Sequence, residues 1–101
     1  METKNKAKSS NFVVLYFETD GYTDPELKTA PVDLDTAKAK LKELWEADLK
    51  DKGYKMPKVD EYGDLCSKDA YLSADCEEAT TKPYAGAKYK HKWLVLELPA
   101  K

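Results

Sequence analysis

Two apolar runs lie near the ends of the chain, at residues 12–17 and 93–96, and neither alternates between apolar and polar positions. A strand with one face in water carries a polar side chain at every second position, whereas a strand buried on both faces is apolar throughout. The two runs therefore predict strands that are covered on both sides. We place the first strand at residues 11–18 and the last at residues 89–98.

A long amphipathic helix is predicted between these strands. Apolar residues recur at three- and four-residue spacing from Leu34 to Leu49, Asp33 or Asp35 can cap the helix, and Gly53 can end it. At about 1.5 Å per residue the helix is about 27 Å long, which is enough to cross three strands.

The rest of the chain has weaker signals. Residues 64–81 fit a short strand or a helix, and we expect a strand at residues 70–73 because a sheet of two strands is marginal in water. Clusters of Gly, Pro and Asp residues elsewhere predict turns and loops. The pattern as a whole predicts an α+β fold, a small two-layer sandwich with one long helix packed on a short sheet of about three strands.

A length of 101 residues, 42% of them hydrophobic, is enough for a single modest core. Residues 1–10 are polar and have no periodicity, so we expect a flexible, lysine-bearing tail there. Residues 11–101 are then a single α+β domain.

One helix can cover one face of a sheet, so the apolar strands require a second cover. We expect the helix to pack on the face that carries the leucines of the last strand, which are Leu94, Leu96 and Leu98. The other face would carry aromatic side chains, and either a partner molecule or residues 54–88 would cover it.

The charge composition excludes several functions. The formal net charge is −2, and all 17 basic residues are lysines. Without arginine the chain lacks the rigid bidentate fork that reads guanine edges and clamps phosphoryl groups. Sequence-specific DNA reading and phosphoryl transfer are therefore not expected.

The chain has no apolar segment long enough to span a membrane, and its N-terminal residues lack the apolar stretch of a secretory signal. Two cysteines, Cys66 and Cys76, are then expected to be reduced thiols. We expect a soluble, cytoplasmic protein.

The ingredients for catalysis are few, because the chain has one histidine, His91, and no recognisable nucleophile or phosphate-binding motif. Structural zinc sites use cysteine pairs spaced two to four residues apart, and Cys66 and Cys76 are not spaced in this way. The acidic segment after the first strand also lacks the calcium-loop pattern. We therefore expect no enzyme activity, no cofactor and no bound metal.

The leading functional hypothesis is a non-enzymatic protein-interaction module, of a small accessory or inhibitor kind, that binds a protein partner or forms a homodimer through an apolar, aromatic sheet face. The aromatic contact residues would be Tyr16, Tyr89 and Trp93. Acidic loops would steer a basic partner toward this face. Their residues are Asp20, Asp24, Asp60, Glu61 and Asp64.

Two alternatives remain open. The first is a sequence-indifferent nucleic-acid-binding accessory protein driven by lysines, which are Lys4, Lys6, Lys8, Lys88, Lys90 and Lys92. The second is a thiol or metal enzyme that uses Cys66, Cys76 and His91.

Overall fold

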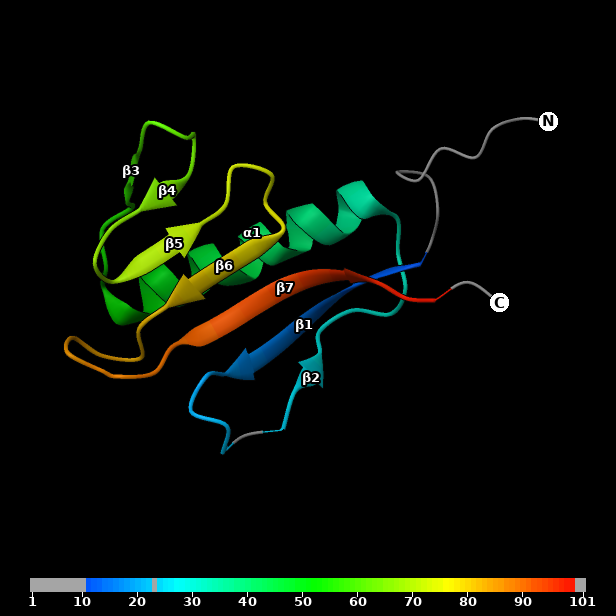
Figure 1. Cartoon of the computed structure of the whole chain (residues 1–101), viewed down its shortest axis with the longest axis horizontal. Helices are drawn as coiled ribbons and strands as arrows, with labels where there is room; N and C mark the ends of the chain where they lie inside the picture. Colours follow the sequence, from blue (N-terminus) through cyan, green and yellow to red (C-terminus); the bar gives the residue numbers. More distant parts are fainter. Residues whose placement is uncertain (1–10, 23, 100–101) are drawn as a thin grey trace.

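The computed structural model describes residues 11–22 and 24–99, so the predicted tail at residues 1–10 lies outside the described part of the chain. One layer is the helix α1 (Leu34–Lys52), and the other is a sheet (Figure 1). Its strands are β1 (Phe12–Glu18), β2 (Glu26–Leu27), β3 (Lys58–Val59), β4 (Leu65–Cys66), β5 (Ala70–Leu72), β6 (Glu78–Thr81) and β7 (His91–Glu97).

The sheet has the strand order β2-β1-β7-β6-β5-β4-β3, with antiparallel pairing between neighbours. The long first and last strands pair along their whole length, with Val14 opposite Val95. Both edges of the sheet are strands of two residues, β2 and β3. Such short edges offer little template for pairing with another chain.

The α+β class fits the structure, but the predicted sheet of about three strands is wrong, because the sheet has seven strands. The first strand, the last strand and the strand at residues 70–73 are found as β1, β7 and β5. Strands β2, β3 and β4 have two residues each, which is too short for a periodic pattern. They form by pairing with the neighbouring strands of the sheet, and no local signal marks them.

The predicted helix is confirmed, and its ends are those that the capping residues indicate. Asp33 accepts a hydrogen bond from the backbone N–H of Thr36 at 2.8 Å, and Gly53 ends the helix in the left-handed conformation at φ 75°. The buried side of α1 follows a four-residue spacing through Ala37, Leu41, Trp45 and Leu49. No helix in the described part of the chain has the length and apolarity needed to cross a membrane.

The expected assignment of the two sheet faces is wrong. Helix α1 packs on the face that carries Phe12, Val14 and Trp93, which are 6%, 0% and 5% exposed. The leucine face of β7, with Leu94 and Leu96, lies on the other side of the sheet. Both faces are apolar in the sequence, and neighbouring residues point to opposite sides, so the pattern of the strands could not decide which face the helix covers.

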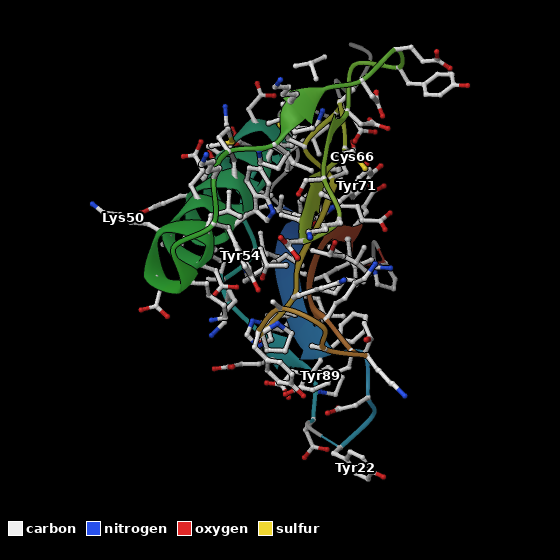
Figure 2. All side chains as sticks on the ribbon, turned by 90° about the vertical axis from the view of Figure 1, so that its left-hand side faces the viewer. Tyr22, Lys50, Tyr54, Cys66, Tyr71 and Tyr89 are labelled. Carbon is white, nitrogen blue, oxygen red and sulfur yellow. The ribbon has the colours of Figure 1, made fainter. Side chains whose placement is uncertain are left out.

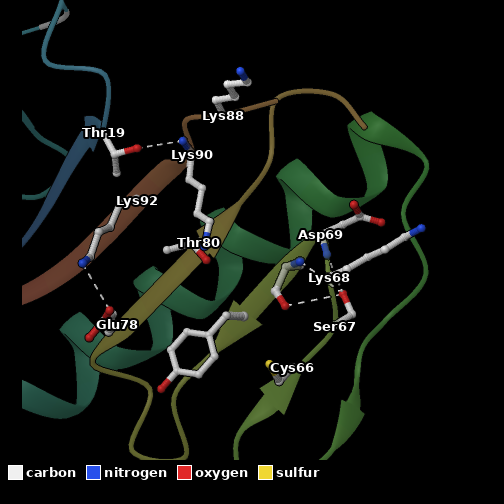
Figure 3. Close-up of a pocket in the computed structure, with 12 residues that line it drawn as sticks. Thr19, Cys66, Ser67, Lys68, Asp69, Glu78, Thr80, Lys88, Lys90 and Lys92 are labelled. Atoms are coloured by element: carbon white, nitrogen blue, oxygen red, sulfur yellow. Dashed lines mark hydrogen bonds and ion pairs between the residues drawn. The ribbon is translucent and has the colours of Figure 1, made fainter. Parts of the chain in front are cut away.

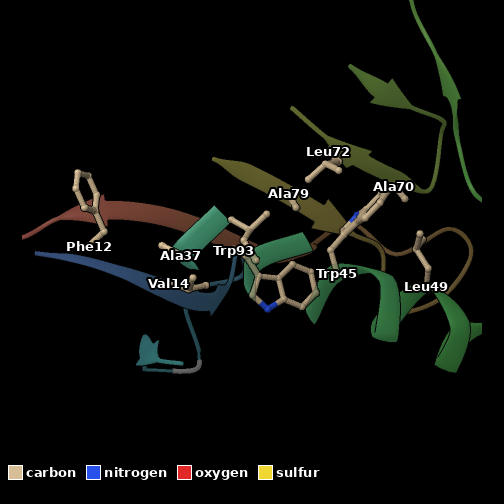
Figure 4. Packing of buried hydrophobic residues seen from close by; sticks show 10 residues of the cluster. Phe12, Val14, Ala37, Trp45, Leu49, Ala70, Leu72, Ala79 and Trp93 are labelled. Carbon is tan, nitrogen blue, oxygen red and sulfur yellow. The ribbon is translucent and has the colours of Figure 1, made fainter. Parts of the chain in front are cut away.

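Trp45 is the centre of the packing between the two layers. It is completely buried, and its indole Nε1 donates a hydrogen bond to the backbone oxygen of Thr80 at 3.0 Å. Ala70, Leu72 and Ala79 belong to the same core cluster (Figure 4). The small side chains of the two alanines leave room on β5 and β6 for the large indole.

Replacement of Trp45 by phenylalanine should lower the free energy of unfolding by about 2 kcal/mol, because it removes buried area and the hydrogen bond to Thr80. Urea unfolding followed by circular dichroism measures this loss. As a control, Lys42→Ala on the exposed side of α1 should change stability by less than about 0.5 kcal/mol. Equal effects of the two substitutions would contradict the central role of Trp45.

Candidate functional site

The face of the sheet turned away from α1 carries a group of apolar side chains that no part of the described chain fully covers. The register places Leu15 between Leu27 of β2 and Leu94 of β7. The side chains of Leu27 and Leu96 are 57% and 39% exposed. We call this side of the sheet the open face, and we define its apolar strip as Leu15, Phe17, Leu27, Leu94 and Leu96.

A hollow of about 460 Å³ lies on the same open face (Figure 3). One row of directly opposed residues crosses four strands from the strip into the hollow, through Phe17, Lys92, Thr80 and Tyr71. Edge-on, Cys66 and Tyr71 lie on the far side of the sheet from α1 (Figure 2). We call this site the lysine hollow, after its residues Lys88, Lys90 and Lys92.

The charges in the lysine hollow are only partly neutralised. Lys92 pairs with Glu78 at 3.2 Å. Lys90 extends across the hollow toward Thr80, and Lys88 stands at its rim (Figure 3). Neither ammonium group forms an ion pair within the described part of the chain. Lys68 and Asp69 also line the hollow, so its four lysines and two carboxylates give it a net charge of +2 next to an apolar surface.

The phenol of Tyr71 completes the wall of the hollow. Its hydroxyl donates a hydrogen bond to Asp64 at 3.4 Å. Burial raises the pKa of Tyr71, and the nearby Asp64 carboxylate raises it further. The phenol therefore remains neutral and presents an aromatic ring rather than a charge.

A second polar site, which we call the Asp48 cluster, lies between α1 and the sheet. Its residues are Glu18, Asp48, Lys52, Thr81 and His91. The Asp48 carboxylate accepts hydrogen bonds from the Thr81 hydroxyl and from Lys52 at 2.8 Å, and His91 Nδ1 lies 3.0 Å from it. His91 Nε2 faces Glu18 at 3.9 Å.

Burial alone would raise the pKa of Asp48, but the hydrogen bonds from Lys52, Thr81 and His91 outweigh it and hold this pKa below its usual value. The hydrogen bond to Asp48 also raises the pKa of Lys52. Asp48 is thus ionised and fully engaged, and the Thr81 hydroxyl is committed as a donor. This arrangement ties α1 to β6 and β7, and it leaves no free nucleophile in the cluster.

The predicted aromatic contact residues are placed in different surroundings. Tyr16 and Trp93 lie together on the helix-facing side, with ring centroids 5.3 Å apart. Tyr89 precedes β7, and its ring centroid lies 6.4 Å from that of Tyr84. The expectation that a partner or the middle segment covers Trp93 is wrong, because α1 buries it. Contact of these three residues with a partner stays a prediction.

The predicted acidic loops do not form one surface. Asp20 follows β1, and Asp24 lies beside the edge strand β2, whereas the other three acidic residues lie in the β3–β4 turn at the opposite edge. Several of these carboxylates shape their own turns. Asp20 accepts from the N–H of Tyr22, Asp60 from Tyr62 and Asp64, and Asp64 from Ala74. Asp24 and Glu61 are exposed.

The structure does not bring the thiols and the imidazole together. Cys66 is exposed on the open face, whereas His91 is on the side of the sheet that faces α1. Cys76 lies in the β5–β6 turn, at the other end of β6 from the Thr81 that pairs with His91. Among the described residues, no group of three or more His, Cys, Asp or Glu side chains could hold a metal ion.

The sequence reasoning missed that the leucine side of the sheet is the side left open, and it missed the lysine hollow that β5, β6 and β7 build. The last strand carried one signal. Lysines occupy alternate positions at its start, and leucines occupy the next positions of the same alternation, so both lie on one face. A lysine-bearing face is the one that a core helix leaves to solvent.

No family model, no curated protein and no solved structure matches this chain. The functional assignment therefore depends on the geometry of the described residues.

Replacement of Asp48 by asparagine should lower the free energy of unfolding at neutral pH by about 2 kcal/mol, because hydrogen bonds to a charged group are lost. A lowered folded-state pKa gives stability that is present above the ordinary value of 3.8 and is lost as the pH falls below it. The difference between wild type and Asp48→Asn should therefore shrink in acid.

Denaturant unfolding over a series of pH values measures this difference, and Asp51→Asn is the matched control. Asp51 follows Asp48 by three residues on α1, and its side chain is 79% exposed. The control should change stability by less than about 0.5 kcal/mol. A constant difference between Asp48→Asn and wild type at all pH values would contradict the assigned ionisation.

Proposed function

We propose that the protein is a non-enzymatic protein-interaction module that binds its partner through the open face of the sheet. The observation that carries this proposal is the position of α1. The helix covers one face of a sheet whose two faces are both apolar, and the strip with Leu27 and Leu96 remains exposed on the other. An exposed group of apolar side chains bordered by charges is typical of a protein interface.

The shape of the sheet favours docking onto its face over pairing with its edge. Both edge strands have two residues, so an added strand would find few backbone groups to pair with. The open face spans the long strands β1 and β7. Its residue Val13 is buried, whereas the side chains of the apolar strip are partly or substantially exposed. A partner segment that presents apolar anchors to this surface would complete the second cover that the sheet lacks.

A different protein fits this surface better than a second copy of the chain. An interface with two-fold symmetry uses the same patch of both copies, so it would bring two lysine hollows to one contact. The repulsion between their free ammonium groups opposes such a dimer. A partner that carries negative charge avoids this cost.

Nucleic acid is the second candidate, because the open face combines lysines with the rings of Phe17 and Tyr71. Bases can stack on such rings while lysines contact phosphates. The net charge of −2 and the absence of arginine weigh against it.

The two free cysteines are consistent with a reducing compartment such as the cytoplasm, where we place the protein.

A double substitution of the apolar strip, Leu27→Ser with Leu96→Ser, should abolish partner binding with little loss of stability. Both side chains are substantially exposed, so their removal should lower the free energy of unfolding by less than about 1 kcal/mol. Affinity capture from the native cell with wild-type and variant protein, read by quantitative mass spectrometry, measures binding.

The matched control removes equally exposed apolar groups from another part of the surface, by Met56→Ser with Val59→Ser. These side chains are 51% and 66% exposed, and they lie on and next to the edge strand β3. The same partner should be retained by wild type and control and lost from the strip variant. Retention by all three proteins would refute binding through the open face.

A further inference from the structure

We infer that the lysine hollow is a subsite for the carboxylate groups of acidic side chains that flank an apolar anchor in the partner. This inference rests on the proposed function and specifies the chemistry of the partner. The expected partner segment places a large apolar residue on the strip and glutamate or aspartate residues beside it, over Lys88 and Lys90.

The hollow and the strip form one continuous surface. Lys92 is directly opposite Phe17 on β1, and Leu94 is directly opposite Glu78 on β6. Side chains of directly opposed residues in an antiparallel pair are about 5 Å apart. A ligand that contacts the strip therefore reaches the hollow with its next side chains, and one short segment can occupy both.

The hollow already holds two carboxylates of the chain itself, those of Glu78 and Asp69. Glu78 lies within it and pairs with Lys92 at 3.2 Å. This pair shows that the geometry of the hollow suits an ammonium–carboxylate contact. Lys88 and Lys90 have the same chemistry but no such partner in the described part of the chain, and the net positive charge of the hollow favours further carboxylates.

Carboxylates fit this site better than phosphates do. Phosphate sites commonly use backbone N–H groups at a helix N-terminus or the fork of an arginine. Here α1 lies on the other side of the sheet, and the chain has no arginine. The strand backbone in the hollow is paired, and the loop N–H groups of Asp69 and Lys90 are bonded to the side chains of Ser67 and Thr19. A lysine ammonium group is a mobile point charge, and a single carboxylate on a flexible side chain can form an ion pair with it.

The test uses a short capped peptide of alternating leucine and glutamate, and a second peptide in which glutamine replaces every glutamate. Binding to the whole protein is measured by isothermal titration calorimetry, and the site is located by amide chemical shifts. The leucine–glutamate peptide should bind and shift the amides of Thr80, Lys90 and Leu94. The glutamine peptide should bind about tenfold more weakly, because exposed ion pairs contribute up to about fivefold each.

The variant Lys88→Gln with Lys90→Gln removes the two free charges and should weaken binding of the glutamate peptide about tenfold, with less dependence on salt. Its control, Lys42→Gln with Lys50→Gln, removes exposed lysines of α1, on the other side of the sheet, and should leave the affinity unchanged. The strip variant Leu27→Ser with Leu96→Ser should lose binding of both peptides.

Each other outcome overturns the inference in a distinguishable way. Loss of binding in the strip variant, with equal affinity for the two peptides and no effect of the lysine substitutions, would refute the carboxylate subsite and leave the proposed function intact. Failure of the glutamate peptide to bind at all would also refute the subsite. Tighter binding of oligothymidylate than of the glutamate peptide would refute it in favour of nucleic acid.

Discussion

The structure depends on the attachment of a single helix to one face of a sheet that is apolar on both faces. Two contacts fix α1 in place, the buried Trp45 indole bonded to the backbone of Thr80 and the Asp48 carboxylate shared by Lys52, Thr81 and His91. The first contact fills the core, and the second satisfies charges that would otherwise be costly to bury. Together they decide which side of every strand faces the helix.

The open face follows from that attachment. Once Trp93 and Val14 lie beneath α1, the alternation of the strands turns Leu94, Leu15 and Lys92 to the other side. The apolar strip and the lysine hollow are therefore neighbours by geometry, although their residues come from distant segments. This combination of an apolar surface and positive charge is the basis of the proposal that the partner presents an acidic segment.

Prediction from the sequence succeeded where one segment carries a complete local signal. The helix has its cap at Asp33, its stop at Gly53 and its periodic apolar side, and the strands β1 and β7 have long apolar runs. Strands of two residues such as β2 carry no period, and they exist because a longer neighbour offers hydrogen bonds. The lysine hollow escaped prediction for a similar reason, since Tyr71, Thr80 and Lys92 meet through the register of three strands.

The sequence by itself determined the helix, the two long strands and the fact that one helix cannot cover both faces of the sheet. The tertiary structure decided which face remains open, and with it which residues are available to a partner. The physical reason is that a strand has a period of two, so packing on either face satisfies the same apolar pattern. Trp45 and Asp48 hold the helix on one face through hydrogen bonds to residues of β6 and β7, which are far from the helix in the sequence.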